Sequence, residues 1–253
     1  MHKLLWLLFV SINSSTVYSD EVGDKKTVAL RIASAANFYP TLKKITKNYE
    51  ASSNNKITII RGSTGKLYAQ IVRGAPYDIF FSADSVRIDK LVEQGKTIDY
   101  ENNKSSFVYA IGALALWKPN ANNSQQLEKL LKSGKFNKLA IANPKIAPYG
   151  RASIEALKAL NIYKVVKQKL VYGENIAQVM QFVQSGAADI GLLAKSYISQ
   201  DNAWDISSRY HNPIKQKVAI LKQSQKKEIA KDFLQYFNRP EIQNMIKNDG
   251  YKI

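Results

Sequence analysis

The chain has no cysteine among its 253 residues, and this absence excludes several kinds of chemistry at once. Without a thiol there is no disulfide, no thiolate nucleophile and no cysteine-based zinc site. A lipid anchor on a mature N-terminal cysteine is excluded as well. Histidine is nearly absent too. His2 lies in a predicted leader, so His211 is the imidazole that any Ser-His-Asp triad of the mature chain would have to use. His211 precedes Asn212-Pro213 in a predicted loop, which favours a hinge or surface role over catalysis.

Long apolar runs are scarce, and the clearest one lies at the N-terminus. Residues 1–19 are predicted to form a cleaved secretory signal peptide. Lys3 supplies its positive region and Leu4 to Val10 its apolar region, and the segment Val17-Tyr18-Ser19 has small residues at the positions that a signal peptidase recognises. The apolar region is too short to span a bilayer. We therefore expect an exported, soluble protein of the periplasm.

Acidic residues are few, at 20 Asp and Glu against 37 Lys and Arg, which gives a formal net charge of +17. A basic protein attracts anions in general, including nucleic acid, anionic membranes and small oxyanions. The lysines are spread over many segments at helical spacing, as on solvated helix faces, and no nucleic-acid recognition motif accompanies them. We therefore expect no nucleic-acid partner.

Strand-to-helix turns with a hydroxyl residue are the most informative feature that is present. An apolar run over Val28–Ala33 leads to Ser34, and a second run over Ile57–Ile60 leads to Ser63. Apolar residues at helical spacing follow each turn. A helix N-terminus has unpaired N–H groups and a partial positive charge, and a serine adds one more donor. Ordinary N-capping explains either serine alone, but two such turns after neighbouring strands predict an anion site.

The alternation of strands and helices predicts a two-lobed α/β fold. Each lobe would be a mostly parallel sheet flanked by helices, with the ligand in the cleft between the lobes. The predicted boundaries are 27–106 plus 215–253 for lobe 1, and 107–214 for lobe 2. The chain is expected to pass from lobe 1 to lobe 2 for the first time between residues 100 and 107, where a polar stretch precedes the apolar run from Phe107 to Trp117. The second crossing is expected at 210–216.

The segment Ser63-Thr64-Gly65-Lys66 also has the serine-x-x-lysine spacing of acyl-enzyme hydrolases. The other elements of those enzymes are missing, since Lys96-Thr97 is followed by Ile98 instead of glycine. A nucleotide P-loop does not fit either, because too few residues precede Gly65-Lys66 and Leu67 follows the lysine. An exported serine hydrolase using Ser63 and Lys66 therefore stays a less favoured alternative.

Seven motifs in order make the chain resemble the periplasmic molybdate-binding proteins of ABC transporters, from about Leu30 to the C-terminus. Any one of them alone is unspecific, whereas the ordered set is highly specific. The motifs are Ala33-Ser34-Ala35-Ala36-Asn37, Gly62-Ser63-Thr64-Gly65-Lys66-Leu67-Tyr68-Ala69-Gln70-Ile71, Gly74-Ala75-Pro76-Tyr77-Asp78-Ile79-Phe80, Phe81-Ser82-Ala83-Asp84, Pro148-Tyr149-Gly150-Arg151-Ala152, Gly173-Glu174-Asn175-Ile176 and Gly186-Ala187-Ala188-Asp189-Ile190-Gly191.

The resemblance implies a set of ligand-binding residues. Ser34 and Ser63 would each offer a hydroxyl and a main-chain N–H to an oxyanion, while Tyr149 and Ile176 would offer main-chain N–H groups. Molybdenum would be bound only as molybdate through these residues. The resemblance implies no catalytic residue and no cofactor.

One departure from the family concerns the strand that ends at Ala194. Many members place a tyrosine hydroxyl on the ligand from this strand, and alanine cannot supply one. Tyr149, Asn175 and Lys66 are the candidates to replace that donor.

The function that the resemblance implies is binding of molybdate, and of the similarly sized tungstate, for delivery to the membrane permease of an ABC transporter. We expect a monomer that is not an enzyme. A site of fixed neutral donors selects by size, because an ion with shorter bonds leaves buried donors unpaired. Another oxyanion, such as sulfate or phosphate, remains an open alternative.

Overall fold

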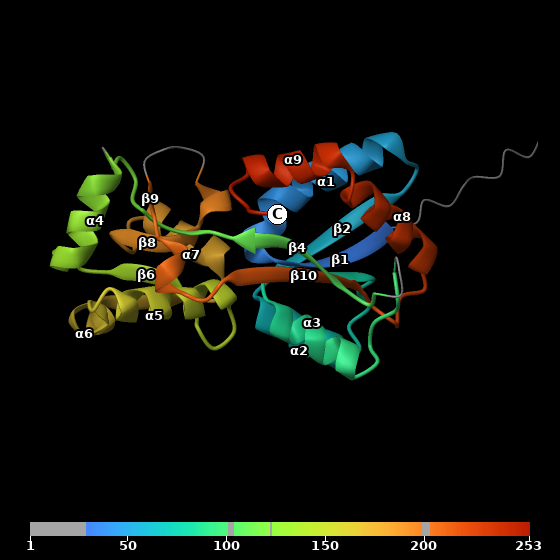
Figure 1. Ribbon diagram of the computed structural model, residues 1–253, viewed down its shortest axis with the longest axis horizontal. Helices are drawn as coiled ribbons and strands as arrows, with labels where there is room; N and C mark the ends of the chain where they lie inside the picture. The colour runs from blue at the N-terminus through green and yellow to red at the C-terminus, as the bar shows by residue number, and fades with distance from the viewer. Residues whose placement is uncertain (1–28, 101–103, 122, 199–202) are drawn as a thin grey trace, which may run out of the picture.

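The computed structural model describes residues 29–100, 104–121, 123–198 and 203–253. The signal peptide predicted over residues 1–19 lies outside these ranges. The described chain forms two five-stranded sheets, one in each of two lobes, with helices packed on their faces (Figure 1). This arrangement confirms the predicted two-lobed α/β fold. In this part of the chain we find no helix with the length and apolar character needed to cross a membrane.

The sheet of lobe 1 has the strand order β2-β1-β3-β10-β4. The first three of these strands are parallel, and β10 is antiparallel to both of its neighbours. Its strands are β1 (Ala29–Ala35), β2 (Lys56–Gly62), β3 (Ile79–Ser82), β4 (Phe107–Gly112) and β10 (Ile214–Ile220). Its helices are η1 (Ala36–Phe38), α1 (Tyr39–Ser52), α2 (Thr64–Val72), α3 (Ser85–Glu93), α8 (Lys227–Phe237) and α9 (Pro240–Asn248).

The sheet of lobe 2 has the order β7-β6-β8-β5-β9, again with three parallel strands followed by antiparallel ones. Its strands are β5 (Leu114–Trp117), β6 (Leu139–Ala142), β7 (Leu170–Gly173), β8 (Ile190–Ala194) and β9 (Ala203–Asp205). Its helices are α4 (Ser124–Ser133), α5 (Pro148–Ala159), α6 (Tyr163–Val166), η3 (Lys167–Lys169), α7 (Ile176–Gln184), η4 (Lys195–Tyr197) and η5 (Ser208–Tyr210).

Alternation along the buried strands divides the core of lobe 1 into two layers. Leu30 and Ile32 of β1 face the layer that contains α1, α8 and α9, whereas Ala33 faces the layer that contains α2 and α3. The figure shows these two groups of helices on opposite faces of the sheet (Figure 1). Because successive side chains of a strand point to opposite faces, a strand covered on both sides is apolar throughout. This explains why the strand sequences are near-continuous hydrophobic runs.

The first lobe crossing lies later in the chain than predicted. Strand β4 pairs with β10 in the sheet of lobe 1, and β5 belongs to lobe 2, so the chain crosses at Ala113 and not within 100–107. The predicted boundary at 107 is therefore wrong. At this point a Cβ on Gly112 would lie 2.2 Å from the Tyr149 hydroxyl, so a glycine is needed where lobe 2 packs against the crossing. The return crossing lies between β9 and β10.

We predict that Phe233→Ala lowers the free energy of unfolding by about 3–5 kcal/mol. Phe233 is fully buried on α8, and its ring lies edge-on to Tyr49 with centroids 5.2 Å apart. Urea denaturation of both proteins measures the difference. Tyr172→Ala is the control, because Tyr172 is 48% exposed and its loss should change stability by no more than about 0.5 kcal/mol. A change below about 1 kcal/mol for Phe233→Ala would contradict this packing.

Candidate functional site

A small pocket, with a cavity volume of about 10 Å³, lies between the lobes at the point where strands of both sheets end. Four helices begin at it: η1 and α2 of lobe 1, and α5 and α7 of lobe 2. Each follows a strand directly or after a short turn. The carboxyl ends of parallel strands lie at one edge of a sheet, so the helices that follow them start at the same edge. Two such edges face each other across the pocket.

The pocket offers neutral hydrogen-bond donors instead of charged groups. Of the described residues that line it, none is acidic or basic. The first turns of α2, α5 and α7 also contain no acidic residue, although such residues commonly offset the positive end of the helix dipole there. The first N–H groups of a helix have no partner within it. This combination leaves the pocket free to receive an external anion.

Ser63 lies at the N-cap position of α2, but it does not form the usual cap. Its side chain makes no capping hydrogen bond, and its hydroxyl is buried without a hydrogen-bond partner among the described residues. An unpaired buried polar group costs about 1–3 kcal/mol, and each one in a native protein calls for an explanation. A ligand in the pocket that Ser63 lines would supply the missing partner.

Asn175, by contrast, is a conventional N-cap. Its Oδ1 accepts hydrogen bonds from the N–H groups of Ala177 at 3.0 Å and Gln178 at 3.2 Å. It lines the pocket together with Ile176, the first residue of α7. The side-chain oxygen of Asn175 is thus used to begin the helix that presents the Ile176 N–H.

Ser34 is fully buried near the end of β1, next to the pocket but not among the residues that line it. Its hydroxyl donates to the carbonyl of Ala35 at 3.1 Å. The lining residues at this turn are Ala35, Ala36 and Asn37. A ligand contact from the Ser34 hydroxyl stays a prediction, and it would require the hydroxyl to leave its present acceptor.

Tyr149 is the second residue of α5, and it lines the pocket while its ring is buried. Its hydroxyl has no hydrogen-bond partner among the described residues and lies against Gly112 at the lobe crossing. Burial raises the pKa of the Tyr149 phenol well above its ordinary value, so the hydroxyl stays protonated at neutral pH. The Tyr149 hydroxyl is thus an unpaired buried donor, as the Ser63 hydroxyl is, in addition to the main-chain N–H that the family resemblance assigns to the ligand.

Lys66 does not line the pocket. Its Nζ lies 3.1 Å from Glu174 Oε2, in an exposed ion pair that joins the two lobes. The suggestion that Lys66 replaces the missing donor at Ala194 is therefore not supported. The same contact argues against a serine hydrolase, because neither Lys66 nor another described residue hydrogen-bonds to the Ser63 hydroxyl.

Among the lining residues that the sequence prediction missed, Asn37 and Thr64 have polar side chains. Thr64 Oγ1 accepts a hydrogen bond from the Ala83 N–H at 3.2 Å. Asn37 Nδ2 donates to Gln216 Oε1 at 2.7 Å. Both residues lie in motifs that also contain a predicted site residue. Their hydrogen-bond partners, Gln216 and Ala83, are distant in sequence, so the fold is needed to identify these contacts. In the part of the chain with described coordinates, no group of three or more His, Asp or Glu side chains could hold a metal ion.

Comparison with known proteins identifies the class of this molecule. Residues 30–252 match the family described as bacterial extracellular solute-binding protein. The chain belongs to this family, and it is therefore a solute-binding protein and not an enzyme.

Particular relatives are molybdate-binding proteins, which confirms the resemblance found from the motifs. Molybdate-binding protein ModA of Azotobacter vinelandii is 35% identical over 88% of this chain and 89% of its own length. ModA of Rhodobacter capsulatus is 35% identical over 87% of this chain and 86% of its own length. The solved periplasmic molybdate-binding protein of A. vinelandii superposes with a TM-score of 0.82 at 34% identity, covering 88% of this chain and 99% of that one.

We predict opposite effects on stability for the two N-cap residues of the pocket. Asn175→Ala should lower the free energy of unfolding of the ligand-free protein by about 1 kcal/mol, because two capping hydrogen bonds are lost. Ser63→Ala should not lower it and should raise it by up to about 1–3 kcal/mol, because the substitution removes a buried hydroxyl that has no hydrogen-bond partner. Urea denaturation of both variants measures the difference. Equal losses would show that Ser63 caps α2 in solution.

Proposed function

We propose that this protein binds molybdate in the periplasm and delivers it to the membrane permease of an ABC transporter. The observation that supports this most strongly is the buried, unpartnered Ser63 hydroxyl in a pocket where four helices begin. The names of the relatives supply the identity of the oxyanion, and the pocket supplies a physical reason for it.

Binding of a tetrahedral dianion follows from the donors at the pocket. Main-chain N–H groups of the four helices, including those of Tyr149 and Ile176, would donate to its oxygens, and Ser63 would add its hydroxyl. Ser34 would contribute once its hydroxyl turns from the Ala35 carbonyl. The helix dipoles offset the negative charge of the ion, so no basic side chain is needed inside the pocket.

Selectivity would come from the fixed spacing of donors held by two lobes. Molybdate and tungstate have longer bonds to oxygen than sulfate and phosphate, and a smaller ion would leave buried donors unpaired at about 1–3 kcal/mol each. Ala194 lies fully buried at the end of β8 and cannot contribute a hydroxyl. We infer that main-chain donors satisfy the ligand without the tyrosine that many relatives have there.

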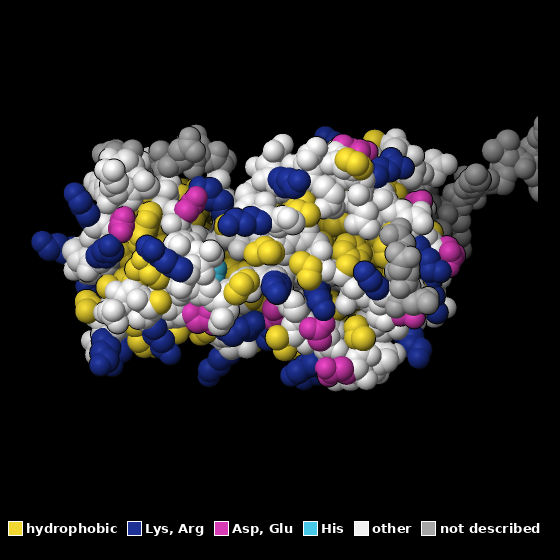
Figure 2. Space-filling view, viewed as in Figure 1, with side chains coloured by type: hydrophobic (Ala, Val, Ile, Leu, Met, Phe, Trp, Pro, Cys, Tyr) yellow, Lys and Arg dark blue, Asp and Glu magenta, His cyan; other side chains and the backbone are white. Residues whose placement is uncertain are grey.

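The surface of the protein fits a carrier of anions. Lysine and arginine side chains are spread over both lobes on the face shown in Figure 2, with fewer acidic side chains between them. Such a field raises the rate of encounter with anions without setting specificity. We expect a monomer that is exported by its signal peptide, closes its lobes around the ion by a hinge motion and then docks on the permease.

A thermal-shift series tests this proposal. Molybdate and tungstate should each raise the melting temperature of the mature protein, since a ligand at ~100 times its dissociation constant stabilises by about 2.7 kcal/mol. Sulfate and phosphate at the same concentrations should have little effect.

The series includes Ser63→Ala and Ser34→Ala, each expected to weaken molybdate binding about tenfold through the loss of a hydrogen bond to a charged group. Ser133→Ala, on α4 and away from the pocket, is the matched control and should bind as the parent does. Stabilisation by sulfate or phosphate alone would reassign the ligand, and Ser63→Ala binding like the parent would contradict the site.

A further inference from the structure

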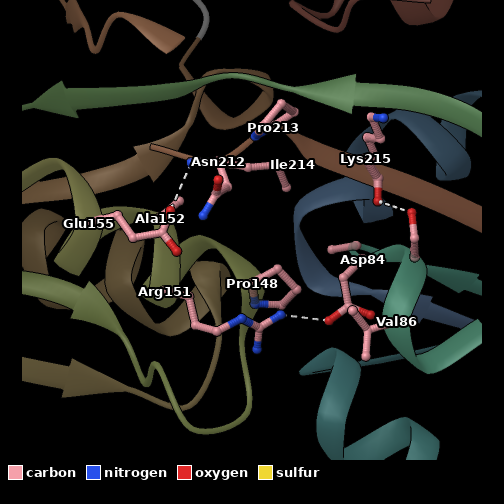
Figure 3. A pocket seen from close by; sticks show the side chains of 12 residues that line it. Asp84, Val86, Pro148, Arg151, Ala152, Glu155, Asn212, Pro213, Ile214 and Lys215 are labelled. Carbon is pink, nitrogen blue, oxygen red and sulfur yellow. Dashed lines mark hydrogen bonds and ion pairs between the residues drawn. The ribbon is translucent and has the colours of Figure 1, made fainter. Parts of the chain in front are cut away.

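A groove of about 410 Å³ runs between the lobes beside the oxyanion pocket. Across it, Arg151 of lobe 2 reaches Asp84 of lobe 1, and both side chains are seen in Figure 3 pointing toward each other. Arg151 Nη2 donates to Asp84 Oδ2 at 2.7 Å. This ion pair joins the start of α5 in one lobe to the start of α3 in the other.

Asp84 is held in place by its own lobe, whether or not Arg151 is near. Its Oδ1 accepts from the N–H of Arg87 at 3.1 Å and so caps α3, and its Oδ2 pairs with the Arg87 guanidinium. The Asp84 side chain is only 10% exposed. If the lobes separate, Asp84 keeps Arg87 and no buried charge is left unpaired. Opening of the lobes therefore breaks one charged hydrogen bond, and it does not add the free-energy cost of an unpaired buried carboxylate.

The ion pair is connected to the pocket on both sides. On lobe 1, the Ala83 N–H donates to Thr64 Oγ1 at 3.2 Å, which ties the residue before Asp84 to the first residue of α2. On lobe 2, Arg151 lies in the first turn of α5, two residues after Tyr149. A movement that separates Arg151 from Asp84 therefore also separates two of the helix starts that surround the ligand.

A backbone contact brings the same two helix starts together. The Gly65 N–H donates to the Ile146 carbonyl at 2.9 Å across the cleft. A Cβ on Gly65 would lie 2.9 Å from Arg87 Nη2 and 3.0 Å from the Ile146 carbonyl oxygen. Lobe 2 thus approaches lobe 1 so closely here that only a glycine fits. The Arg151–Asp84 pair stands near this close contact, because the Arg87 guanidinium approaches Gly65 and pairs with Asp84.

We propose that Arg151 stabilises the closed form of the two lobes over the ligand, and that its ion pair with Asp84 slows ligand release. This inference rests on the proposed function for the identity of the ligand. Closure turns the neutral Asp84–Arg87 pair into a group with net charge +1 at the rim of the pocket, which also favours a bound dianion. The second inter-lobe pair, Lys66–Glu174, is 54% and 41% exposed and contributes little, because solvent screens it.

Dissociation of molybdate from the mature protein tests the proposal: the protein is loaded with radiolabelled molybdate, and loss of the bound label is followed after addition of excess unlabelled molybdate. Arg151→Gln should release the ligand about five- to tenfold faster with an unchanged association rate, because one charged hydrogen bond across the cleft is lost. Arg151→Lys should recover part of the effect. Lys66→Gln is the matched control and should release the ligand within about twofold of the parent.

A second measurement needs no ligand and therefore separates this inference from the proposed function. The chain has no cysteine, so Val72→Cys in lobe 1 and Val165→Cys in lobe 2, both at exposed positions, can be spin-labelled without background. The distance distribution between the labels should shift toward open forms in Arg151→Gln. Parent-like distances together with a parent-like release rate would overturn the inference. Absence of molybdate binding by the parent would overturn the proposed function, and the label distances would still decide the role of Arg151.

Discussion

The convergence of four helix N-termini on one pocket is the constraint on which the rest of this structure depends. Helix ends of like sign repel one another, and buried donors without acceptors are costly. Their convergence on one pocket is favourable only when an anion occupies it. The absence of acidic side chains from the pocket and from the first turns of α2, α5 and α7 keeps that place for an external ion. The Ser63 hydroxyl, which is buried without a hydrogen-bond partner among the described residues, is a further donor at this pocket.

The two-lobed fold is what brings the four helix N-termini together around one pocket. Each sheet brings two helix starts to its own edge, and the chain crosses between the sheets at Ala113 and again before β10. Separation of the lobes exposes the donors to water, and closure surrounds the ligand. The close approach at Gly65, the packing of Tyr149 on Gly112 and the Arg151–Asp84 pair define the closed form. Binding and closure are therefore one event in this account.

Local patterns in the sequence predicted the parts of the site that depend on neighbouring residues. The strand-to-helix turn before Ser63 follows from apolar periodicity and its turn residue, the family resemblance adds Ile176, and the structure places both residues at the pocket. Contacts between distant residues could not be predicted. The uninterrupted apolar run from Phe107 to Trp117 conceals the lobe crossing, because β4 is assigned to lobe 1 only by pairing with β10, about a hundred residues later. Likewise, the sequence made Lys66 a candidate ligand donor, and it could not show that Lys66 pairs with Glu174, 108 residues away.

The most direct test of the central claim is a crystal structure of the mature protein grown with tungstate, with diffraction measured at the tungsten absorption edge. The account predicts one strong anomalous peak between the lobes. The oxygens of that ion should lie within hydrogen-bonding distance of the Ser63 hydroxyl and of main-chain N–H groups from both lobes. A peak elsewhere, or an ion held by lysine or arginine side chains instead of helix N-termini, would contradict it.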